Sequence, residues 1–502
     1  MTDITIPIPP RTADVSADLV AKRYRAERRF RAYGLISLGV TALFLAFLVV
    51  DIVGKGLPAF FEHTVTLPIT INADKVDAAD PAKGDFSTMA KDALKEAFPG
   101  MSGRADRKTL LGLLSTGAGD DLRSRVVSDP SLIGQTANVA LLMSADADLY
   151  FKGTQTGVVK STGTSPIEIT KLNDKFSING NFGSADVGTI IRVNDGAFRV
   201  RALNGSTIDA EVLIEPTATG NVPAGSWQQL QFSKAEADRR ITDKEAVVLE
   251  TLQERGLVSN GIAWRFFTSG DSREPELSGI KGALVGSLLT IVITLAISLP
   301  VGIAAAIYLE EFARKGRMTD FIEVNINNLA AVPSIIFGLL GLAVFLNFFG
   351  MPRSAPLVGG LVLALLVLPT IIIASRAAFR SVPPSIKEAA LGVGASHQQA
   401  VFHHVLPLAV PGILTGTILG VARALGETAP LLMIGMVAFI VDVPKGVTDA
   451  ATLLPVQIYL WSDLPELGFQ SRTAAAIILL MVVLFALNAV AIYLRKRFER
   501  RW

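Results

Sequence analysis

The sequence predicts an all-α polytopic membrane protein that carries an inserted α/β domain. Half of its residues are hydrophobic and its mean hydropathy is +0.44, which is too apolar for an ordinary soluble protein. Six apolar stretches approach or exceed the roughly 20 residues that an α-helix needs to cross a bilayer. Between the first and second of them lies a polar stretch, residues 54–278, which is long enough to fold as its own domain.

Composition also excludes several classes of function. The chain has 47 Lys and Arg against 45 Asp and Glu, so it has no global charge that would attract nucleic acid. It contains no cysteine, which excludes a disulfide framework, a thiolate metal site and a cysteine nucleophile. The ATPase phosphate loop and the common hydrolase, metalloprotease and kinase signatures are missing from the sequence. We therefore expect a chain that is not an enzyme and that holds neither metal nor cofactor.

The amino-terminal region predicts a basic cytoplasmic tail, residues 1–33, followed by a transmembrane helix at 34–53. Seven basic residues lie between Arg11 and Arg31. A cleavable signal peptide is the alternative, but its apolar region would be shorter and would be followed by a small-residue cleavage site. Asp51, Gly54 and Lys55 stand there instead. We expect a retained anchor.

Residues 54–278 combine a helical part with an antiparallel sheet. Helices are expected at Ser87–Phe98 and over the run Lys108–Val127. The turns Asp195-Gly196 and Asn204-Gly205 are strong hairpin signals, and the expected strands beside them are Thr189–Val193, Phe198–Leu203 and Thr207–Ile214. The helical spacing of apolar residues within 235–256 predicts a connecting helix that returns the chain to the membrane.

The carboxy-terminal part, residues 279–494, predicts five further spans. They are expected at about 280–308, 323–349, 356–378, 408–440 and 474–494. Lys and Arg are concentrated in segments 1–33, 309–322, 376–407 and 495–502, and are scarce in loops 347–355 and 441–473. Because basic residues favour the cytoplasmic side, this asymmetry predicts that both termini, including the tail 495–502, and the loop 380–407 are cytoplasmic. The domain 54–278 is then extracytoplasmic.

Arg423 and Glu427 are the formal charges that lie well inside an expected span. A charge at the centre of a lipid-exposed helix costs a few kcal/mol, so both should face protein or water and have partners. They are four residues apart, hence on one helix face and able to pair with each other. A purely structural ion pair is the alternative to a substrate pathway. An arginine offers a planar fork of donors that suits an oxyanion, and the glutamate would compensate its charge.

The same span carries a stripe of small residues at steps of four. They are Gly412, Gly416, Gly420, Ala424 and Thr428. Such a stripe lets another helix approach closely. Whether that helix belongs to this chain or to a second subunit stays open.

The loop 380–407 carries an ordered motif. It consists of Glu388, Ala389 and Ala390, then Gly394 and Ala395, then Leu406 and Pro407. A short helix, a turn that Gly394 permits, and a second short helix ending at Leu406 and Pro407 are expected. The motif resembles the EAA loop by which permeases of ABC importers dock onto their ATPases, with His404 where that pattern usually has an aliphatic residue.

Three of the four histidines also lie in this loop, at positions 397, 403 and 404. A metal site is one interpretation, but no carboxylate or cysteine accompanies them at ligand spacing. We expect solvated or interface histidines.

The segment RALGETAP, Arg423–Pro430, resembles the fifth helix of phosphate-specific permeases of the PstA type. Four further stretches are similar to the same family: Trp264–Thr268, Ile307–Ala313, Asn328–Leu342 and Val382–Ala390. The resemblance implies a type I ABC importer core of five helices, preceded here by one amino-terminal helix. It also implies that Arg423, Glu427 and Thr428 belong to the substrate pathway. Two features depart from the family: Arg376 and Ala377 stand where relatives often have acidic residues, and the domain 54–278 is a large insertion.

The resemblance implies a permease subunit of an ATP-driven phosphate importer in the bacterial inner membrane. Its implied partners are a PstC-type permease, a PstB-type ATPase dimer that holds ATP and Mg, a PstS-type phosphate-binding protein and the lipid bilayer. Transport of another oxyanion, such as sulfate or molybdate, is the first alternative. A membrane receptor or sensor is the second, and the EAA-like loop disfavours it because a receptor has no need to dock an ATPase.

Overall fold

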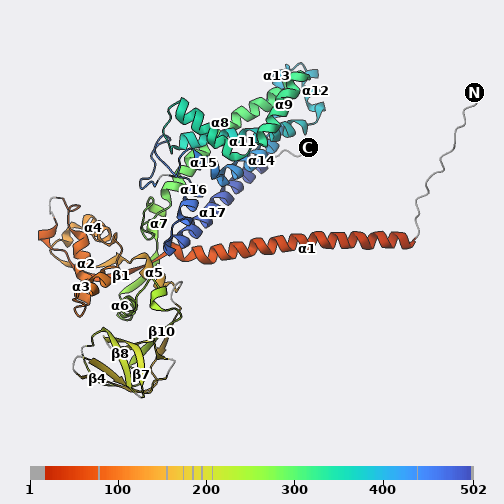
Figure 1. Cartoon of the computed structure of the whole chain (residues 1–502). Coiled ribbons are helices and arrows are strands. Elements are labelled where there is room, and N and C mark those ends of the chain that lie inside the picture. The colour runs from red at the N-terminus through yellow and green to blue at the C-terminus, as the bar shows by residue number, and fades with distance from the viewer. Residues whose placement is uncertain are drawn as a thin grey trace, which may run out of the picture. The chain divides into compact units, whose positions relative to one another are not determined.

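The computed structural model describes residues 17–498 except 77–79, 154–156, 173–174, 184–185, 194–195, 206, 217 and 438. Asp195 of the expected hairpin turn and the outer ends of both expected tails therefore lie outside the described residues. The chain divides into two compact units, Met1–Gly54 and Lys55–Trp502. Figure 1 shows the elements of both.

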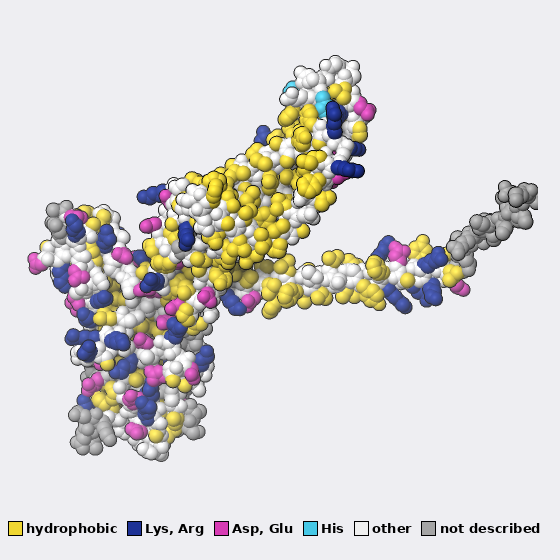
Figure 2. All heavy atoms as spheres, turned by 45° about the horizontal axis from the view of Figure 1, so that its top comes forward, with side chains coloured by type: hydrophobic (Ala, Val, Ile, Leu, Met, Phe, Trp, Pro, Cys, Tyr) yellow, Lys and Arg dark blue, Asp and Glu magenta, His cyan; other side chains and the backbone are white. Residues whose placement is uncertain are grey.

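The first unit consists of most of α1, a single helix over Ala17–Gly56. This helix is longer than the expected span 34–53, because the basic segment before that span is helical as well. Lys and Arg side chains gather on its amino-terminal part and hydrophobic side chains follow along the rest (Figure 2). Basic side chains next to an apolar span are typical of the cytoplasmic flank of a membrane helix.

Five helical segments of the described chain are long and apolar enough to cross a membrane. They are Asp18–Phe60, Lys281–Phe312, Pro356–Arg380, His397–Gly426 and Leu467–Phe498. A sixth crossing exists if the bent pair Arg317–Ala330 and Ser334–Phe348 counts as one span. The chain is therefore a multi-pass membrane protein with five or six candidate spans.

Two expected spans are wrong in their extent, and proline explains both. The stretch 323–349 forms α9 (Arg317–Ala330) and α10 (Ser334–Gly341), which meet at 98° across Pro333. Proline disfavours helical geometry in the residue before it and donates no backbone hydrogen bond. Among the described residues of the stretch 408–440, helix is confined to α14 (Leu406–Gly426) and the short α15 (Ala429–Met433), whose first turn contains Pro430.

The helices after residue 280 form the bundle. They are α8 (Lys281–Ile307), which a π-helical turn Tyr308–Phe312 extends, then α9, α10 with the π-helical segment Leu342–Phe348, α11 (Pro356–Arg380), α12 (Pro384–Gly392), α13 (His397–Gln399), the π-helical turn Ala400–Val405, α14, α15, α16 (Leu454–Ser462) and α17 (Leu467–Phe498). Helix α11 is the most buried of the candidate spans and packs against both α8 and α14. Hydrophobic side chains cover much of the visible bundle surface in Figure 2, as expected for a lipid-facing surface.

The glycine stripe of α14 lies against α11 of the same chain. A Cβ added at Gly412 would lie 2.6 Å from the Cβ of Ala378, and one added at Gly420 would lie 2.6 Å from Cγ1 of Val367. A Cβ on Gly416 would overlap the Cβ of Ala374. Intrachain packing therefore occupies these three positions.

The helical part of the inserted domain surrounds a three-stranded sheet, ordered β11-β1-β2. Its strands are β1 (Phe61–Thr70), β2 (Thr136–Leu142) and β11 (Val258–Ile262), and its helices are α2 (Phe86–Ala97), α3 (Arg104–Leu111), α4 (Ala118–Ser128), α5 (Ala145–Phe151) and α6 (Asp243–Glu254). The helix expected at Ser87–Phe98 is confirmed as α2. The single helical run Lys108–Val127 is wrong, because the chain leaves the helix between Gly112, which caps α3, and Gly117, which precedes α4.

The second part of the domain is an eight-stranded antiparallel sheet, ordered β3-β10-β6-β7-β8-β5-β4-β9. The strands are β3 (Val158–Thr162), β4 (Ile167–Leu172), β5 (Lys175–Asn179), β6 (Ile190–Val193), β7 (Gly196–Asn204), β8 (Thr207–Ile214), β9 (Gly220–Val222) and β10 (Trp227–Phe232). The three expected strands are confirmed as β6, β7 and β8, paired in sequence. Phe198 and Ile178 are fully buried in the core of this sheet.

Helix α6 is not the connector to the membrane that the sequence predicts. Its Val248 and Leu249 lie in the core around the three-stranded sheet, while Val247 lies in a second cluster with Ile190 and Leu230 of the larger sheet. A helix that is apolar on more than one face is buried between layers. The chain instead returns to the bundle through β11 and the short helix α7 (Trp264–Thr268).

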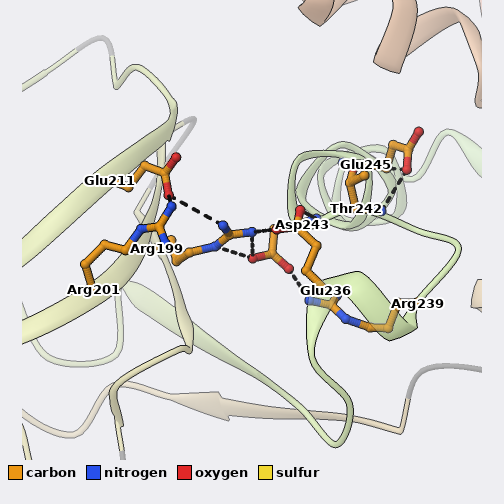
Figure 3. A network of polar contacts seen from close by, with 8 residues as sticks. All are labelled: Arg199, Arg201, Glu211, Glu236, Arg239, Thr242, Asp243 and Glu245. Carbon is orange, nitrogen blue, oxygen red and sulfur yellow. Dashed lines mark hydrogen bonds and ion pairs between the residues drawn. The ribbon is translucent and has the colours of Figure 1, made fainter.

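A polar network fixes the amino terminus of α6 to the larger sheet (Figure 3). Nε of Arg199 on β7 donates to Asp243 at 2.5 Å, and the same guanidinium pairs with Glu236. Arg239 also pairs with Asp243 and lies over the ring of Phe232 at 3.8 Å. Thr242 and Glu245 form a capping box, in which the side chain of each accepts a hydrogen bond from the backbone N–H of the other.

The inserted domain meets the start of α17 around Arg472, which is buried. Its guanidinium lies 3.3 Å from the carbonyl oxygen of Ala59 and 3.4 Å from that of Glu276, and it stands over the ring of Phe266. Nearby, Oε2 of Glu62 is buried and has no hydrogen-bond partner among the described residues. Burial raises the pKa of the Glu62 carboxyl, although the positive charge of Arg472 opposes the effect.

We expect Glu62→Gln to raise the Tm of the purified protein at pH 7.5. A raised folded-state pKa means that ionised Glu62 destabilises the folded protein above its unfolded pKa of about 4.3. The gain in Tm should shrink as the pH falls toward that value, where wild-type Glu62 is neutral as well. The exposed Glu168→Gln variant is the control. An equal Tm difference at pH 7.5 and pH 5 would contradict the assignment.

We expect Gly416→Leu to prevent correct packing of α14 on α11. The side chain has no space beside Ala374, and overpacking of this kind costs about 1–3 kcal/mol or more. The yield of monodisperse protein and its Tm should both fall. Leu419→Ala, at an exposed position of the same helix, should leave both near the wild-type values.

Candidate functional site

Arg423 and Glu427 lie at the carboxy-terminal end of α14. Nε of Arg423 is 3.6 Å from Oε1 of Glu427, so the two form an ion pair that is longer than a hydrogen bond. The Arg423 side chain is 41% exposed and that of Glu427 is 20% exposed. The guanidinium has no further partner among the described residues. A loosely held pair with free donors can exchange one partner for a ligand.

The local sequence explains why these charges stand at a helix end. Gly426 is the last residue of α14, and Glu427 adopts extended geometry with φ −81° and ψ 118°. The sequence predicts that Glu427 lies within a continuous span. In the structure it lies in the link between α14 and α15 instead. Arg423 sits in the last turn, where the helix dipole favours a positive charge.

Thr428 precedes α15 and makes no side-chain capping hydrogen bond there. The fifth member of the small-residue stripe is thus outside α14. A Cβ added at Gly338 of α10 would lie 2.6 Å from Cα of Pro430, so α10 packs tightly against α15. The link that carries Glu427 and Thr428 therefore connects α14 to a helix that packs on α10.

The loop 380–407 contains the two expected helical segments. Helix α12 ends at Gly392, and Gly394 has φ +91°, the left-handed geometry that glycine adopts readily. The second segment does not end at Leu406 and Pro407 as predicted. It runs from His397 through the π-helical turn Ala400–Val405 into α14, which gives one helical stretch from His397 to Gly426. Pro407 lies within this stretch, two residues after the π-helical turn ends at Val405.

The motif residues of this loop divide by exposure. Ala390 is buried, Ala395 and Leu406 are half-buried, and the exposed members are Glu388, Ala389, Gly394 and Pro407. The exposed members offer a surface to a partner, while Ala390 holds α12 to the bundle.

The three loop histidines do not form a metal site with one another. Nε2 of His397 lies 2.8 Å from the carbonyl oxygen of Glu311, and its ring packs edge-on against Phe312 at 5.0 Å. His403 and His404 are exposed. Within the described ranges no group of three His, Cys, Asp or Glu side chains could hold a metal ion.

Several charged residues of the bundle escaped the sequence analysis. Arg376, noted only as a departure from the family, has a side chain that is 9% exposed and pairs with two carboxylates. Its Nε is 3.2 Å from Oε2 of Glu310, and its Nη2 is 2.9 Å from Oε2 of Glu323. Arg472 also lies within a candidate span, because α17 begins at Leu467 rather than at the expected 474. The sequence feature that could have indicated these contacts is the acidic pair Glu310 and Glu311, which directly follows the apolar run of α8.

The carboxy-terminal half of the chain matches a family model. Residues 298–502 match the model described as binding-protein-dependent transport system inner membrane component. The chain is 31% identical to the phosphate transport system permease protein PstA 1 of Mycobacterium tuberculosis over 238 residues, which are 47% of this chain and 77% of that protein. The chain belongs to this family of transport permeases.

Other relatives agree with this membership. The chain is 31% identical to the phosphate transport system permease protein PstA of Yersinia pestis, over 42% of this chain and 71% of that protein. It is 33% identical to the probable ABC transporter permease protein YqgI of Bacillus subtilis, over 35% of this chain and 60% of that protein. Residues 17–160 match a second model, described as a domain of unknown function, DUF3333.

Solved structures of ABC transporters resemble part of this chain. An inward-facing MetNI methionine ABC transporter matches 44% of this chain and 95% of its own, with 16% identity and a TM-score of 0.35. A bacterial alginate ABC transporter matches 43% of this chain and 79% of its own, with 18% identity and a TM-score of 0.34.

Membership in the family establishes the general function of the chain. It is a transmembrane permease of an ABC importer, built from a helical core and an inserted mixed α/β region. Permeases of this family are transport subunits rather than enzymes, and the ATPase is a separate subunit. An importer of this type works with an ATPase and a binding protein as partners.

Proposed function

We propose that this chain is a permease subunit of an ATP-driven importer of inorganic phosphate and forms half of its translocation path. The observation that carries the proposal is the Arg423–Glu427 pair. Its arginine is partly exposed, retains free donors and stands at the end of the helical stretch that begins in the loop 380–407. The names of several relatives, which are phosphate transport permeases, support phosphate as the substrate.

Both the arginine and the glutamate of the pair have chemistry that suits phosphate. The guanidinium presents several N–H donors in one plane, which match the oxygens of a tetrahedral oxyanion. Phosphate at neutral pH still carries a proton, so its hydroxyl donates to a carboxylate such as Glu427. Fully deprotonated sulfate has no such donor and is repelled by the same carboxylate. Thr428 adds a hydroxyl that donates or accepts.

The exposed motif residues of the loop 380–407 support docking of a PstB-type ATPase, which would hold ATP and Mg. In this arrangement the coupling surface consists of the exposed Glu388, Ala389, Gly394 and Pro407 with the half-buried Ala395 and Leu406, and the buried Ala390 supports it from below. The loop and both termini are cytoplasmic, the domain 54–278 is periplasmic and the bilayer is the bacterial inner membrane. A PstC-type permease completes the path, and a PstS-type protein delivers phosphate. ATP-driven movement of the loop would reach Arg423 along the stretch His397–Gly426.

Uptake of labelled phosphate tests the proposal. Phosphate-starved cells that lack any other high-affinity system are compared with and without this chain, at micromolar phosphate and with excess sulfate. We expect sulfate-resistant uptake only when the chain is present. Unchanged phosphate uptake with loss of sulfate or molybdate uptake would assign another oxyanion. Unchanged uptake of all three would leave a receptor as the better assignment.

We expect Arg423→Ala to lower phosphate uptake by at least about 10- to 100-fold, because hydrogen bonds to charged groups contribute about 1.5–3 kcal/mol. Assembly with the companion subunits, measured by co-purification, should be retained since the side chain is partly exposed. The exposed Arg353→Ala variant is the control and should transport normally. Wild-type uptake by Arg423→Ala would remove the residue from the pathway.

A further inference from the structure

The end of α8 carries a π-helical turn, Tyr308–Phe312, with two neighbouring carboxylates. The backbone N–H of Ala313 donates to the carbonyl oxygen of Tyr308 at 2.7 Å, five residues back. Such turns contain one residue more than an α-helical turn and are frequently found at functional sites. Here the turn brings Glu310 and Glu311 to partners on different elements.

Glu310 connects the turn to the helices behind it. Its Oε1 accepts from Nε of Arg380 at 2.6 Å, and its Oε2 pairs with Arg376. Arg376 in turn pairs with Glu323 of α9 at 2.9 Å. Two arginines and two carboxylates therefore join α8, α9 and α11 at one end of the bundle.

Glu311 connects the same turn to the loop 380–407. Its side chain is 9% exposed, and Oε2 accepts from Nζ of Lys387 on α12 at 2.5 Å. Its carbonyl oxygen lies 2.8 Å from Nε2 of His397. Because a carbonyl oxygen only accepts, this ring nitrogen carries a hydrogen. Phe312 packs edge-on against the His397 ring, so the turn contacts both helical segments of the loop.

We propose that the turn Tyr308–Phe312 is the joint that makes the coupling loop and helix α9 move together, with Glu311 as the positioning residue for the loop and Glu310 for α9 and α11. The inference rests on the proposed function in one respect, that ATPases act on this loop. From α9 the packing continues across Pro333 into α10, which lies against Pro430 beside Glu427. The joint thus gives the loop a second route to the substrate pair, in addition to α14.

The Glu311–Lys387 contact is suited to a test, because it is partly buried and pairs one carboxylate with one ammonium. Charge reversal at either residue places two like charges together, whereas the double reversal restores an opposite pair. The complete complex with its ATPase and companion permease is reconstituted in proteoliposomes with binding protein and inorganic phosphate. The variants are Glu311→Lys, Lys387→Glu and both together. Lys315→Glu, an exposed neighbour with no contact found among the described residues, is the matched control.

We expect both single reversals to lower the phosphate moved per ATP hydrolysed by about tenfold or more, since two like charges facing each other at a partly buried position are strongly unfavourable. The double variant should recover most of the ratio, and Lys315→Glu should retain it. A purely structural defect would lower transport and hydrolysis together and leave the ratio unchanged. The inference is overturned if the single variants keep the wild-type ratio, or if the double variant is no better than the worse single.

Should Glu311→Lys not assemble, Glu311→Gln takes its place with the same expected loss of phosphate moved per ATP hydrolysed.

A second readout does not depend on the substrate. Because the chain has no cysteine, Met318→Cys on α9 and Val393→Cys in the loop, both exposed, introduce unique spin-label sites. In the otherwise wild-type chain we expect the distance between the two spin labels to have one narrow distribution that is the same with and without ATP. A broader or shifted distribution is expected with Glu311→Lys or Glu311→Gln, and an unchanged one overturns the joint. If the wild-type complex instead moves no phosphate while these distances behave as expected, only the proposed substrate fails.

Discussion

Every charge within the apolar bundle must find a partner, and the arrangement of the other elements follows from this constraint. Arg376 pairs with two carboxylates and Glu311 pairs with Lys387. Arg472 contacts two backbone carbonyl oxygens and an aromatic ring. Arg423 is held more loosely than these residues. Its single long contact with Glu427 and its larger exposure leave hydrogen-bond donors of the guanidinium unused.

Hydropathy was sufficient to locate the spans, because a helix in lipid needs a long apolar run. It could not locate their ends. Pro333 and Pro430 interrupt stretches that are apolar throughout, and the break follows from backbone geometry rather than from polarity. The Arg423–Glu427 pair was predictable from its spacing of four residues. The contacts of Arg376 were not, since Glu310 lies 66 residues away in the sequence.

The inserted domain shows the same division between local and non-local information. The strands beside Asn204-Gly205 were predictable, because that dipeptide favours one turn geometry between alternating residues. The place of α6 was not, because its apolar residues serve two cores that only the fold brings together. The network around Asp243 then fixes the larger sheet to this helix, and Arg472 fixes the start of α17 to Ala59 and Glu276.

The continuity of the helical stretch from His397 to Gly426 has a mechanical consequence. At about 1.5 Å per residue its 30 residues span about 45 Å, so this one stretch connects the loop with Arg423. At Gly412, Gly416 and Gly420 no side chain of this stretch inserts between its backbone and α11. The side chains of Ala378, Ala374 and Val367 of α11 fill the space beside these glycines, so the backbones of the two helices lie close together. A displacement of the loop would therefore act on α11 as well as on Arg423.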